Sequence, residues 1–360
     1  MIKRIHNFCA GPCMLPLDVL EEAQSEFVDF HGAGMSLLEM SHRSKEYDAI
    51  HYEAMSLATE LYQAPKDFKV LFIQGGASLQ FAMVPMNFLI DGQKGAYLNT
   101  GSWGKAAIRD GRNHGSIYIA WDGEPIDFMR MPVSSEMELS ENTRYLHVTS
   151  NETIGGIRVS EWPDVAVPLV VDMSSDYMSR PVPWEKFDLV YGGAQKNLGP
   201  AGMSIVFIRE SLLASTNRKL ANYLRYDIHA AGDSLFNTPP VFVIYMFGKV
   251  MKWMKENGGL VAMERAAEKK SGKLYEVIDD GNYYHCPVNT DNRSHMNVVF
   301  KLPNVELEGK FLAEAAQLDF VNLKGHRSVG GCRASIYNAM PMASVEALAE
   351  FMAEFRRING

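Results

Sequence analysis

One stretch of sequence decides the fold: Gly192-Gly193-Ala194-Gln195-Lys196-Asn197-Leu198-Gly199-Pro200. Apolar runs at 187–191 and 203–208 flank this stretch and predict two buried strands. Lys196 therefore follows the end of a strand, among small residues that let other groups approach closely. A desolvated lysine has a lowered pKa and can attack a carbonyl carbon. Taken alone, the stretch fits a surface turn better, so the rest of the chain has to decide between the two interpretations.

Strands and helices alternate from residue 69 onward. Further apolar runs predict strands at 69–73, 96–100, 116–120, 145–149 and 169–172. Helical patterns follow two of them, over 79–90 and in a segment that reaches about residue 112. Strands that are apolar throughout and separated by helices predict a mostly parallel sheet covered on both faces. Ligands of such α/β sheets bind beyond the carboxyl ends of the strands.

Residues of functional type gather at these predicted strand ends. They are Ser78, Trp103, Thr153, Asp172 and Lys196. The turn 74–78 leads into a helix and predicts an anion site, because backbone N–H groups and the helix dipole converge there. It has neither a GxGxxG nor a Walker pattern, so neither a dinucleotide nor a P-loop site is predicted.

Each of these residues also has a simpler interpretation when it is taken singly. Trp103 fits a core aromatic side chain, and Asp172 fits a cap or a turn. Together they match one cofactor, pyridoxal phosphate. That cofactor needs a lysine for its Schiff base and an acid at its pyridinium nitrogen. Trp103 would stack on its ring, and the glycine turn would hold its phosphate.

Bulk composition narrows the class of protein. At 360 residues, we expect two domains or one large domain with a smaller partner. The net charge of -8 argues against a general nucleic-acid binder. Cys9, Cys13, Cys286 and Cys332 form no CxxC pair or metal-like cluster, which favours a reducing compartment. Without a signal-peptide pattern or an apolar run of about 20 residues, we expect a cytoplasmic location.

The two ends of the chain have a different character from the middle. A helix is predicted over 17–31, and the polar cluster 41–44 fits a loop. A helix-like segment ends at Gly258-Gly259. Beyond it, helices are predicted over 263–278, 307–318 and the last residues, with strands over 296–302, 320–323 and 332–337. This C-terminal part predicts a smaller α+β unit with its own core.

Longer motifs add a resemblance that covers nearly the whole chain. They are Ala10-Gly11-Pro12, Ser41-His42-Arg43, Gly75-Gly76, Asn151-Glu152-Thr153-Ile154, Gly193-Ala194-Gln195-Lys196-Asn197, Phe236-Asn237-Thr238-Pro239-Pro240, Lys324-Gly325-His326-Arg327 and Arg333-Ala334-Ser335-Ile336-Tyr337-Asn338. With them the chain resembles the class V aminotransferases, which are pyridoxal-phosphate enzymes of fold type I, and among these the phosphoserine aminotransferase family. The resemblance implies a large domain at 16–258 with a mostly parallel, seven-stranded sheet. It implies a small α+β domain made of 1–15 and 259–360.

The resemblance also implies roles around the cofactor. Lys196 forms the Schiff base and then moves the proton, and Asp172 pairs with the pyridine nitrogen. Trp103 stacks on the ring, and Thr153 lies near its phenolic oxygen. The remaining implied ligands hold the phosphate: Gly76, Ala77, Ser78 and Gln195 from one subunit, and Asn237 and Thr238 from its neighbour. The implied assembly is therefore a homodimer with shared sites.

Substrate binding is implied in the same way. Arg333 matches the residue that binds the α-carboxylate, and the distal anion would meet His42, Arg43, His326 and Arg327. Ser78 stands where some relatives carry an arginine, which would reduce the cations around that anion. The implied reaction converts 3-phosphohydroxypyruvate and L-glutamate to O-phospho-L-serine and 2-oxoglutarate, in serine biosynthesis. The phosphohydroxythreonine step of pyridoxine biosynthesis stays open.

Two other functions have to be weighed. Another class V enzyme, a cysteine desulfurase or an alanine–glyoxylate type transaminase, would share the cofactor residues. A desulfurase needs a cysteine in a flexible loop, whereas Cys332 lies in a predicted strand. Alanine would make no use of two histidines and two arginines. A non-catalytic anion-binding protein would explain the glycine turn and the basic residues, but it would leave Lys196 and Asp172 without a role.

Overall fold

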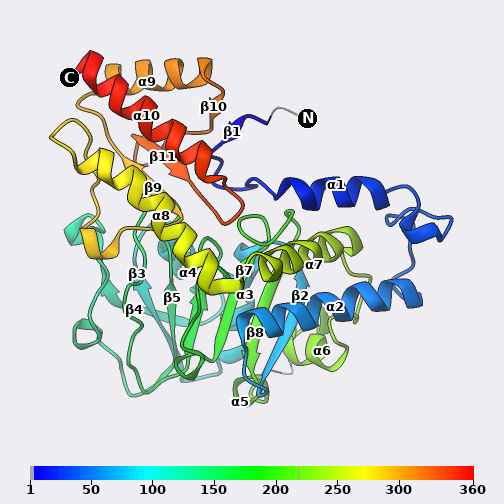
Figure 1. Cartoon of the computed structure of the whole chain (residues 1–360). Helices are drawn as coiled ribbons and strands as arrows, with labels where there is room; N and C mark the ends of the chain where they lie inside the picture. The colour runs from blue at the N-terminus through cyan, green and yellow to red at the C-terminus, as the bar shows by residue number, and fades with distance from the viewer. Residues whose placement is uncertain (1–3, 218) are drawn as a thin grey trace.

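The computed structural model describes residues 4–217 and 219–360, and a seven-stranded sheet lies at its centre (Figure 1). In spatial order the strands are β2-β8-β7-β6-β5-β3-β4. Their bounds are β2 Phe68–Gln74, β3 Lys94–Asn99, β4 Ser116–Asp122, β5 Thr143–Thr149, β6 Leu169–Asp172, β7 Leu189–Gly193 and β8 Met203–Arg209. Strand β8 is antiparallel to both of its neighbours, and the other neighbouring pairs are parallel. The predicted fold class, a mostly parallel sheet of seven strands, is confirmed.

The one reversed strand brings two distant turns together. Strands β2 and β7 both run antiparallel to β8, so they point in the same direction and end at the same edge of the sheet. The turn after β2 begins at Gly75, and the loop from β7 to β8 ends at Gly202. The Gly75 N–H donates to the Gly202 carbonyl at 3.0 Å. The glycine turn and the lysine loop, more than a hundred residues apart in sequence, therefore lie side by side.

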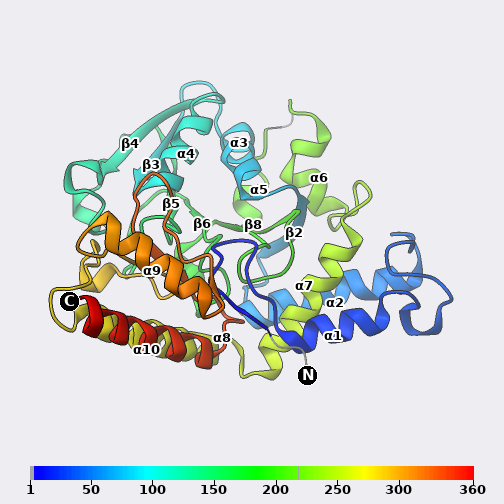
Figure 2. The ribbon, with the colours of Figure 1, turned by 90° about the horizontal axis from the view of Figure 1, so that it is seen from above.

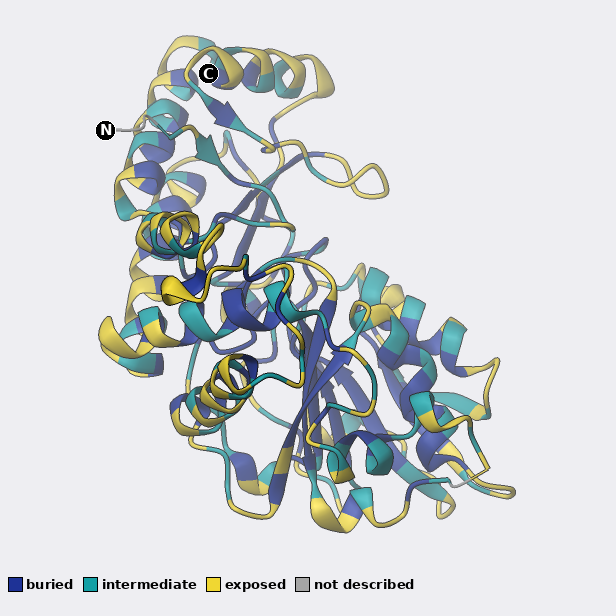
Figure 3. Ribbon diagram, turned by 90° about the vertical axis from the view of Figure 1, so that its right-hand side faces the viewer, coloured by how far each residue is buried: buried dark blue, intermediate teal, exposed yellow. Residues whose placement is uncertain are grey.

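Alternate residues of each strand belong to two different hydrophobic cores. In β8, Ile205 and Phe207 belong to one core, and Val206 and Ile208 belong to the other. Because helices cover both faces, successive strand residues are all apolar. Figure 3 shows the strands as almost uniformly buried, with helices that are buried only on their inner sides. The covering helices are α2 Lys45–Tyr62 and α7 Val241–Glu256 on the first core, and α3 Ala77–Phe88 and α4 Ser102–Gly111 on the second.

The C-terminal elements lie over the carboxyl edge of the large sheet and form their own short pairings (Figures 1 and 2). Strand β9 (Asn297–Phe300) pairs antiparallel with β11 (Cys332–Ser335). Strand β1 (His6–Asn7) pairs parallel with β10 (Phe320–Val321), so the N-terminal segment joins the C-terminal elements. The remaining helices are α1 Leu17–Glu26, α5 Glu210–Leu213, α6 Tyr226–Ala231, α8 Gly259–Asp279, α9 Val305–Gln317 and α10 Met342–Asn359.

Some element boundaries differ from the prediction. The helix predicted over 17–31 ends at Glu26, and His31 beyond it has a positive φ of 51°. No helix was predicted over 45–62, yet α2 begins there, with the Ser44 hydroxyl accepting a hydrogen bond from Tyr47 N–H at 3.2 Å. The polar cluster 41–44 is therefore partly a helix cap. Within the described residues, no helix is long and apolar enough to cross a membrane.

Burial on both faces predicts a strong dependence on strand valines. Val171 in β6 is fully buried, whereas Val305 at the start of α9 is 81% exposed. The Val171→Ala change should lower the free energy of unfolding by about 2 kcal/mol, because it removes buried methyl groups and leaves a cavity. The matched change Val305→Ala should alter it by less than about 0.5 kcal/mol. Urea titration measures both changes in the free energy of unfolding. Equal losses would contradict the burial of the sheet between helices on both faces.

Candidate active site

Most of the predicted cofactor residues line one cavity at the carboxyl edge of the sheet. The structure brings together there Gly76, Ala77, Ser78, Trp103, Thr153, Asp172, Gln195 and Lys196. Strands β2, β3, β5, β6 and β7 each lead into one of these positions. Residues that were not predicted complete the wall, namely Phe81, Thr149, Asn151, Ser174, Ser175 and Gly193.

Lys196 is the amine of this cavity. The side chain is 8% exposed, and its Nζ donates to Thr153 Oγ1 at 2.6 Å. Nζ lies 5.5 Å from the centre of the Trp103 ring. Burial lowers the pKa of Lys196 to about 8, and the negative charge of Asp172 opposes that shift. Near neutral pH the amine is therefore poised to lose its proton, which a nucleophile and proton carrier requires.

Asp172 supplies a buried acid at the end of β6. Its Oδ1 accepts hydrogen bonds from the Ser174 N–H at 2.9 Å and the Ser174 hydroxyl at 2.6 Å. Burial raises the pKa of Asp172, while Ser174 and Lys196 act in the opposite direction. Among the described residues, no hydrogen bond goes to Oδ2. The carboxylate is thus held in place by one oxygen and retains a second for a partner.

Trp103 is fixed by a buried acid that sequence reasoning did not single out. Glu152 accepts hydrogen bonds from the backbone N–H groups of Trp103 at 3.0 Å and Gly104 at 2.8 Å, in the first turn of α4. Gly101 makes this contact possible, because an added Cβ would lie 2.8 Å from the Glu152 carboxyl carbon. Burial raises the pKa of Glu152, and the two backbone donors oppose the rise. Glu152 acts as a helix cap supplied from a different strand end.

The turn after β2 forms the anion side of the cavity. Helix α3 begins at Ala77 with Gly76 as its N-cap, and no side chain caps it. Its first N–H groups are therefore free to bind an anion. Asn237 and Thr238 do not line the cavity. In the same chain they contact Gln74, with Gln74 Nε2 donating to the Thr238 carbonyl at 2.7 Å and Asn237 Nδ2 donating to Gln74 Oε1 at 3.1 Å.

The residues present fit pyridoxal phosphate. One cavity contains the Lys196 amine, the Asp172 carboxylate with its unbonded oxygen, and the Trp103 ring. The N-terminus of α3, which no side chain caps, lies beside them. Two polar side-chain atoms of the wall, Trp103 Nε1 and Thr149 Oγ1, are buried without a hydrogen bond. Buried polar atoms usually have partners, so these two are consistent with a polar ligand that fills the cavity. Lys196, Asp172, Trp103 and the start of α3 would hold the cofactor.

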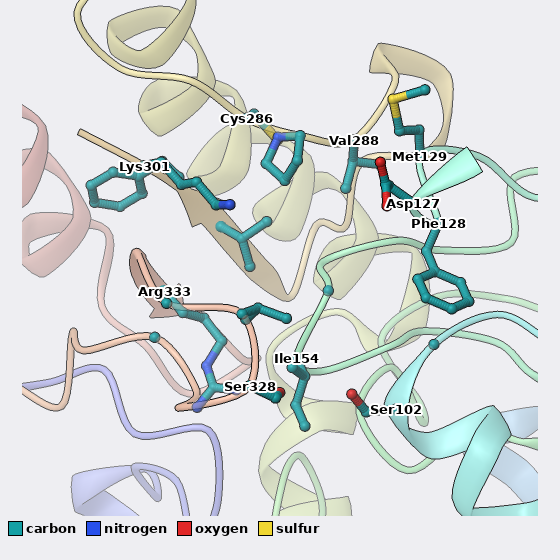
Figure 4. Close-up of a pocket in the computed structure, with 18 of the residues that line it drawn as sticks. Ser102, Asp127, Phe128, Met129, Ile154, Cys286, Val288, Lys301, Ser328 and Arg333 are labelled. Carbon is teal, nitrogen blue, oxygen red and sulfur yellow. The ribbon is translucent and has the colours of Figure 1, made fainter. Parts of the chain in front are cut away.

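Arg333 connects this cavity to a larger one. Its Nη1 donates to the Thr153 carbonyl at 3.1 Å, and its Nε is buried without a hydrogen bond. Arg333 lines a cavity of about 740 Å³ that begins at Gly101 and Ile154, beside the cofactor residues Trp103 and Thr153. In Figure 4, Arg333 lies on one side of this cavity and Phe128 on the other. An arginine with free donors here is suited to binding a carboxylate next to Lys196.

The four other predicted substrate residues are not gathered within one chain. His42 and Arg43 lie in the segment between α1 and α2, which Figures 1 and 2 place at the right-hand end of the molecule. His326 and Arg327 lie in the segment between β10 and β11, on the left. His326, Arg327 and Arg43 are exposed, and His42 is half-buried. The His326 ring contacts the Ser328 hydroxyl at 2.7 Å.

An N-terminal segment also reaches the lysine loop, which sequence reasoning did not foresee. Cys13 N–H donates to the Gln195 carbonyl at 3.1 Å, and Cys13 Sγ contacts the Lys196 carbonyl. A Cβ added to Gly11 would lie 3.5 Å from Lys196 Cγ. The Ala10-Gly11-Pro12 motif was the only sequence signal, and it carried no indication of where the segment would pack.

This cavity and fold define a pyridoxal-phosphate site of fold type I, and comparison with known proteins identifies the family. The family model for class-V aminotransferases matches residues 5–348. The chain therefore belongs to the class-V aminotransferase family. A phosphoserine aminotransferase of Niallia circulans is 50% identical, with all of both chains covered. The structure resembles phosphoserine aminotransferase from Bacillus circulans subsp. alkalophilus with a TM-score of 0.97, at 50% identity and 99% coverage of both chains. The pyridoxal-phosphate-bound enzyme from Trichomonas vaginalis gives 0.93, at 38% identity and 97% and 99% coverage.

Burial of the Lys196 amine predicts a pH-dependent stability of the cofactor-free protein. In the unfolded chain a lysine keeps its proton up to about pH 10.4, whereas the buried amine loses it near pH 8. Below about pH 8 the buried amine carries a proton that is better solvated in the unfolded chain, and this lowers the stability of the fold. As the pH rises toward the pKa of the unfolded chain, this loss disappears and the free energy of unfolding increases. Relative to Lys196→Met, the wild-type free energy of unfolding should rise by about 3 kcal/mol between about pH 7.5 and 10.5.

Urea titrations of the two apoproteins across this pH range measure the effect. The change Lys252→Met, at an exposed lysine of α7, is the matched control and should leave the pH profile unchanged. Parallel profiles for wild type and Lys196→Met would contradict the burial of a titrating amine.

Proposed function

We propose that this protein is a pyridoxal-phosphate-dependent transaminase. It exchanges the amino group between L-glutamate and 3-phosphohydroxypyruvate, giving O-phospho-L-serine and 2-oxoglutarate in serine biosynthesis. The observation that carries the proposal is the placement of Lys196 and Asp172 in one buried cavity, with Arg333 beside it. The phosphoserine aminotransferases at about half identity over the full length support the substrate.

The residues of the chain divide the chemistry between them. Pyridoxal phosphate, when bound, supplies an electron sink that lets a proton leave the α-carbon of an amino acid. Lys196 Nζ takes that proton and later returns it. The amine can do so because its lowered pKa makes the neutral form accessible near neutral pH. Asp172 holds a proton at the pyridine nitrogen through its available oxygen. Thr153, which binds Nζ at 2.6 Å, orients the amine.

Substrate selection follows from the charges around the larger cavity. Arg333 binds the α-carboxylate through its free donors and so places the α-carbon near Lys196. The distal phosphate or carboxylate meets His42, Arg43, His326 and Arg327, with Ser78 contributing no charge. The phosphorylated four-carbon substrate of the pyridoxine pathway carries the same two anions, so the same residues can accept it.

Other functions fit the structure less well. A desulfurase would need an accessible thiol, but Cys332 is buried in β11, and burial raises its pKa to about 12. A protein that only binds anions would have no use for burying an amine and an acid in the same cavity, which costs folding free energy.

We also propose a homodimer in the cytoplasm, with domains at 16–258 and at 1–15 with 259–360. The segments that carry the two basic pairs, between α1 and α2 and between β10 and β11, lie on different sides of the molecule in Figures 1 and 2. In a homodimer, each chain would supply one pair to the other's site, so that both pairs meet on one anion. Asn237 and Thr238 would likewise reach the neighbour's cofactor phosphate.

The phosphate requirement gives the most direct test. The purified protein should be yellow with pyridoxal phosphate, and borohydride should attach the cofactor to Lys196. Its kcat/KM for phosphoserine with 2-oxoglutarate should exceed that for serine by at least about a hundredfold, because serine leaves the basic residues unpaired. Mass spectrometry and a 2-oxoglutarate-linked assay measure these quantities. Equal turnover of serine would refute the proposed substrate, and absence of visible absorption would refute the cofactor.

Hybrid dimers test the shared sites. Lys196→Ala and Arg43→Ala chains should each have little activity alone. After unfolding and joint refolding, about half of the dimers are hybrids, and each hybrid has one site with both wild-type residues. The mixture should therefore regain about a quarter of wild-type activity. No gain over the separate variants would mean that each chain builds its own site.

A further inference from the structure

Helix α8 buries one lysine outside the residues assigned to the site. Lys270 is 2% exposed. Its Nζ donates to three backbone carbonyls, those of Tyr337 at 2.6 Å, Met340 at 3.3 Å and Asn338 at 3.4 Å. Burial lowers the pKa of Lys270 to about 7, and the Cys13 thiol opposes the shift. In the described part of the chain, Lys270 forms no ion pair.

A lysine is a costly choice for filling this space. Removing an ammonium from water costs several kcal/mol, and a leucine or methionine would pack the same volume without that cost. What the side chain adds is geometry, because one atom, Nζ, can donate to several carbonyls, and to three of them when it is protonated. It draws three carbonyls of one turn toward a single point. Residues 336–341 between β11 and α10 are therefore shaped by Lys270.

This turn leads directly to the lysine loop. Asn338 N–H donates to Asn197 Oδ1 at 3.0 Å, and Asn338 Nδ2 donates to the Met178 carbonyl at 3.0 Å. Asn197 follows Lys196 in the chain and is anchored in turn, since its Nδ2 donates to the Tyr177 carbonyl at 3.1 Å. A continuous set of hydrogen bonds thus runs from Lys270 through Asn338 to the residue beside the catalytic amine.

The same turn directly follows strand β11, which carries Arg333. Tyr337, the first residue held by Lys270, donates its hydroxyl to the Ala10 carbonyl at 2.8 Å. The N-terminal segment that packs on Lys196 is therefore tied to this turn as well. The two groups that must act on one substrate, Lys196 and Arg333, belong to different sheets, and the turn 336–341 connects them.

We propose that Lys270 is a positioning residue for the transamination, fixing Lys196 relative to Arg333 through Asn338 and Asn197. This role rests on the proposed function of the site. It differs from a purely structural role, in which Lys270 would stabilise the C-terminal elements and leave the chemistry at Lys196 unchanged.

Holoenzyme variants separate the two roles. Lys270→Met and Asn338→Ala should each shift the pH midpoint of the cofactor's visible absorption by about half a unit or more. Each should also lower kcat for phosphoserine about tenfold, because displacement of the amine affects the reaction more than substrate binding. The double variant should shift the midpoint no further than either single change, since both act through one connection. Lys270→Arg keeps a cationic hydrogen-bond donor, so its pH midpoint should lie close to that of the wild-type enzyme.

A matched control and a fallback keep the test decisive. Lys249→Met, which removes a lysine that ties α7 to Glu22 and Glu26, should lower Tm without moving the midpoint. If Lys270→Met does not fold, Asn338→Ala and Lys270→Arg carry the comparison. A lower Tm with wild-type midpoint and kcat, or additive shifts in the double variant, would overturn the proposal. A wild-type enzyme without phosphoserine turnover would instead overturn the proposed function, and this role with it.

Discussion

The structure depends on keeping an amine and a carboxylate buried in one cavity without a direct ion pair between them. Lys196 donates to Thr153 at 2.6 Å, and Asp172 is held by Ser174 through a single oxygen. Burial lowers the pKa of the lysine and raises that of the aspartate, so each group is disfavoured in its charged form. A tight ion pair between them would reduce both pKa shifts and would leave neither group available for the reaction. Instead, neutral neighbours hold each group separately, Thr153 the amine and Ser174 one oxygen of the carboxylate.

The sheet solves the problem of bringing these groups together. Reversal of β8 places the turn at Gly75 against the loop end at Gly202, which joins the helix start at α3 to the lysine loop. The parallel strands then add their own carboxyl ends to the same edge. Glu152 extends the principle, since it follows β5 and caps α4, which begins just beyond β3. Lys196 and Trp103 are therefore each held by a residue that follows a different strand, Thr153 and Glu152 after β5.

The site residues that the sequence pattern predicts are those placed by the ends of strands. Lys196, Asp172 and Trp103 each follow an apolar run, and parallel topology alone brings such positions to one edge. Glu152 acts through long-range hydrogen bonds, which no local pattern encodes. Ser174 binds Asp172 only two residues away, and this local turn was overlooked. Helix α2 was missed because its start, after Ser44, resembled a polar loop. Asn237 and Thr238 contact Gln74 within one chain, and their place at the cofactor phosphate of the neighbouring subunit stays a prediction.

In the proposed reaction, Lys196 and Arg333 must act on the same substrate, although they come from two separate sheets. Lys196 follows a strand of the large sheet, while Arg333 lies on β11, which pairs with β9. The Arg333 N–H also donates to the Leu323 carbonyl at 2.7 Å. A displacement of about 1 Å between reacting groups can cost two orders of magnitude in rate. The direct hydrogen bond from Arg333 Nη1 to the Thr153 carbonyl, at 3.1 Å, connects β11 with the segment that follows β5. A second, buried connection would help to hold the two sheets in register. Lys270 and the turn that it gathers occupy that position.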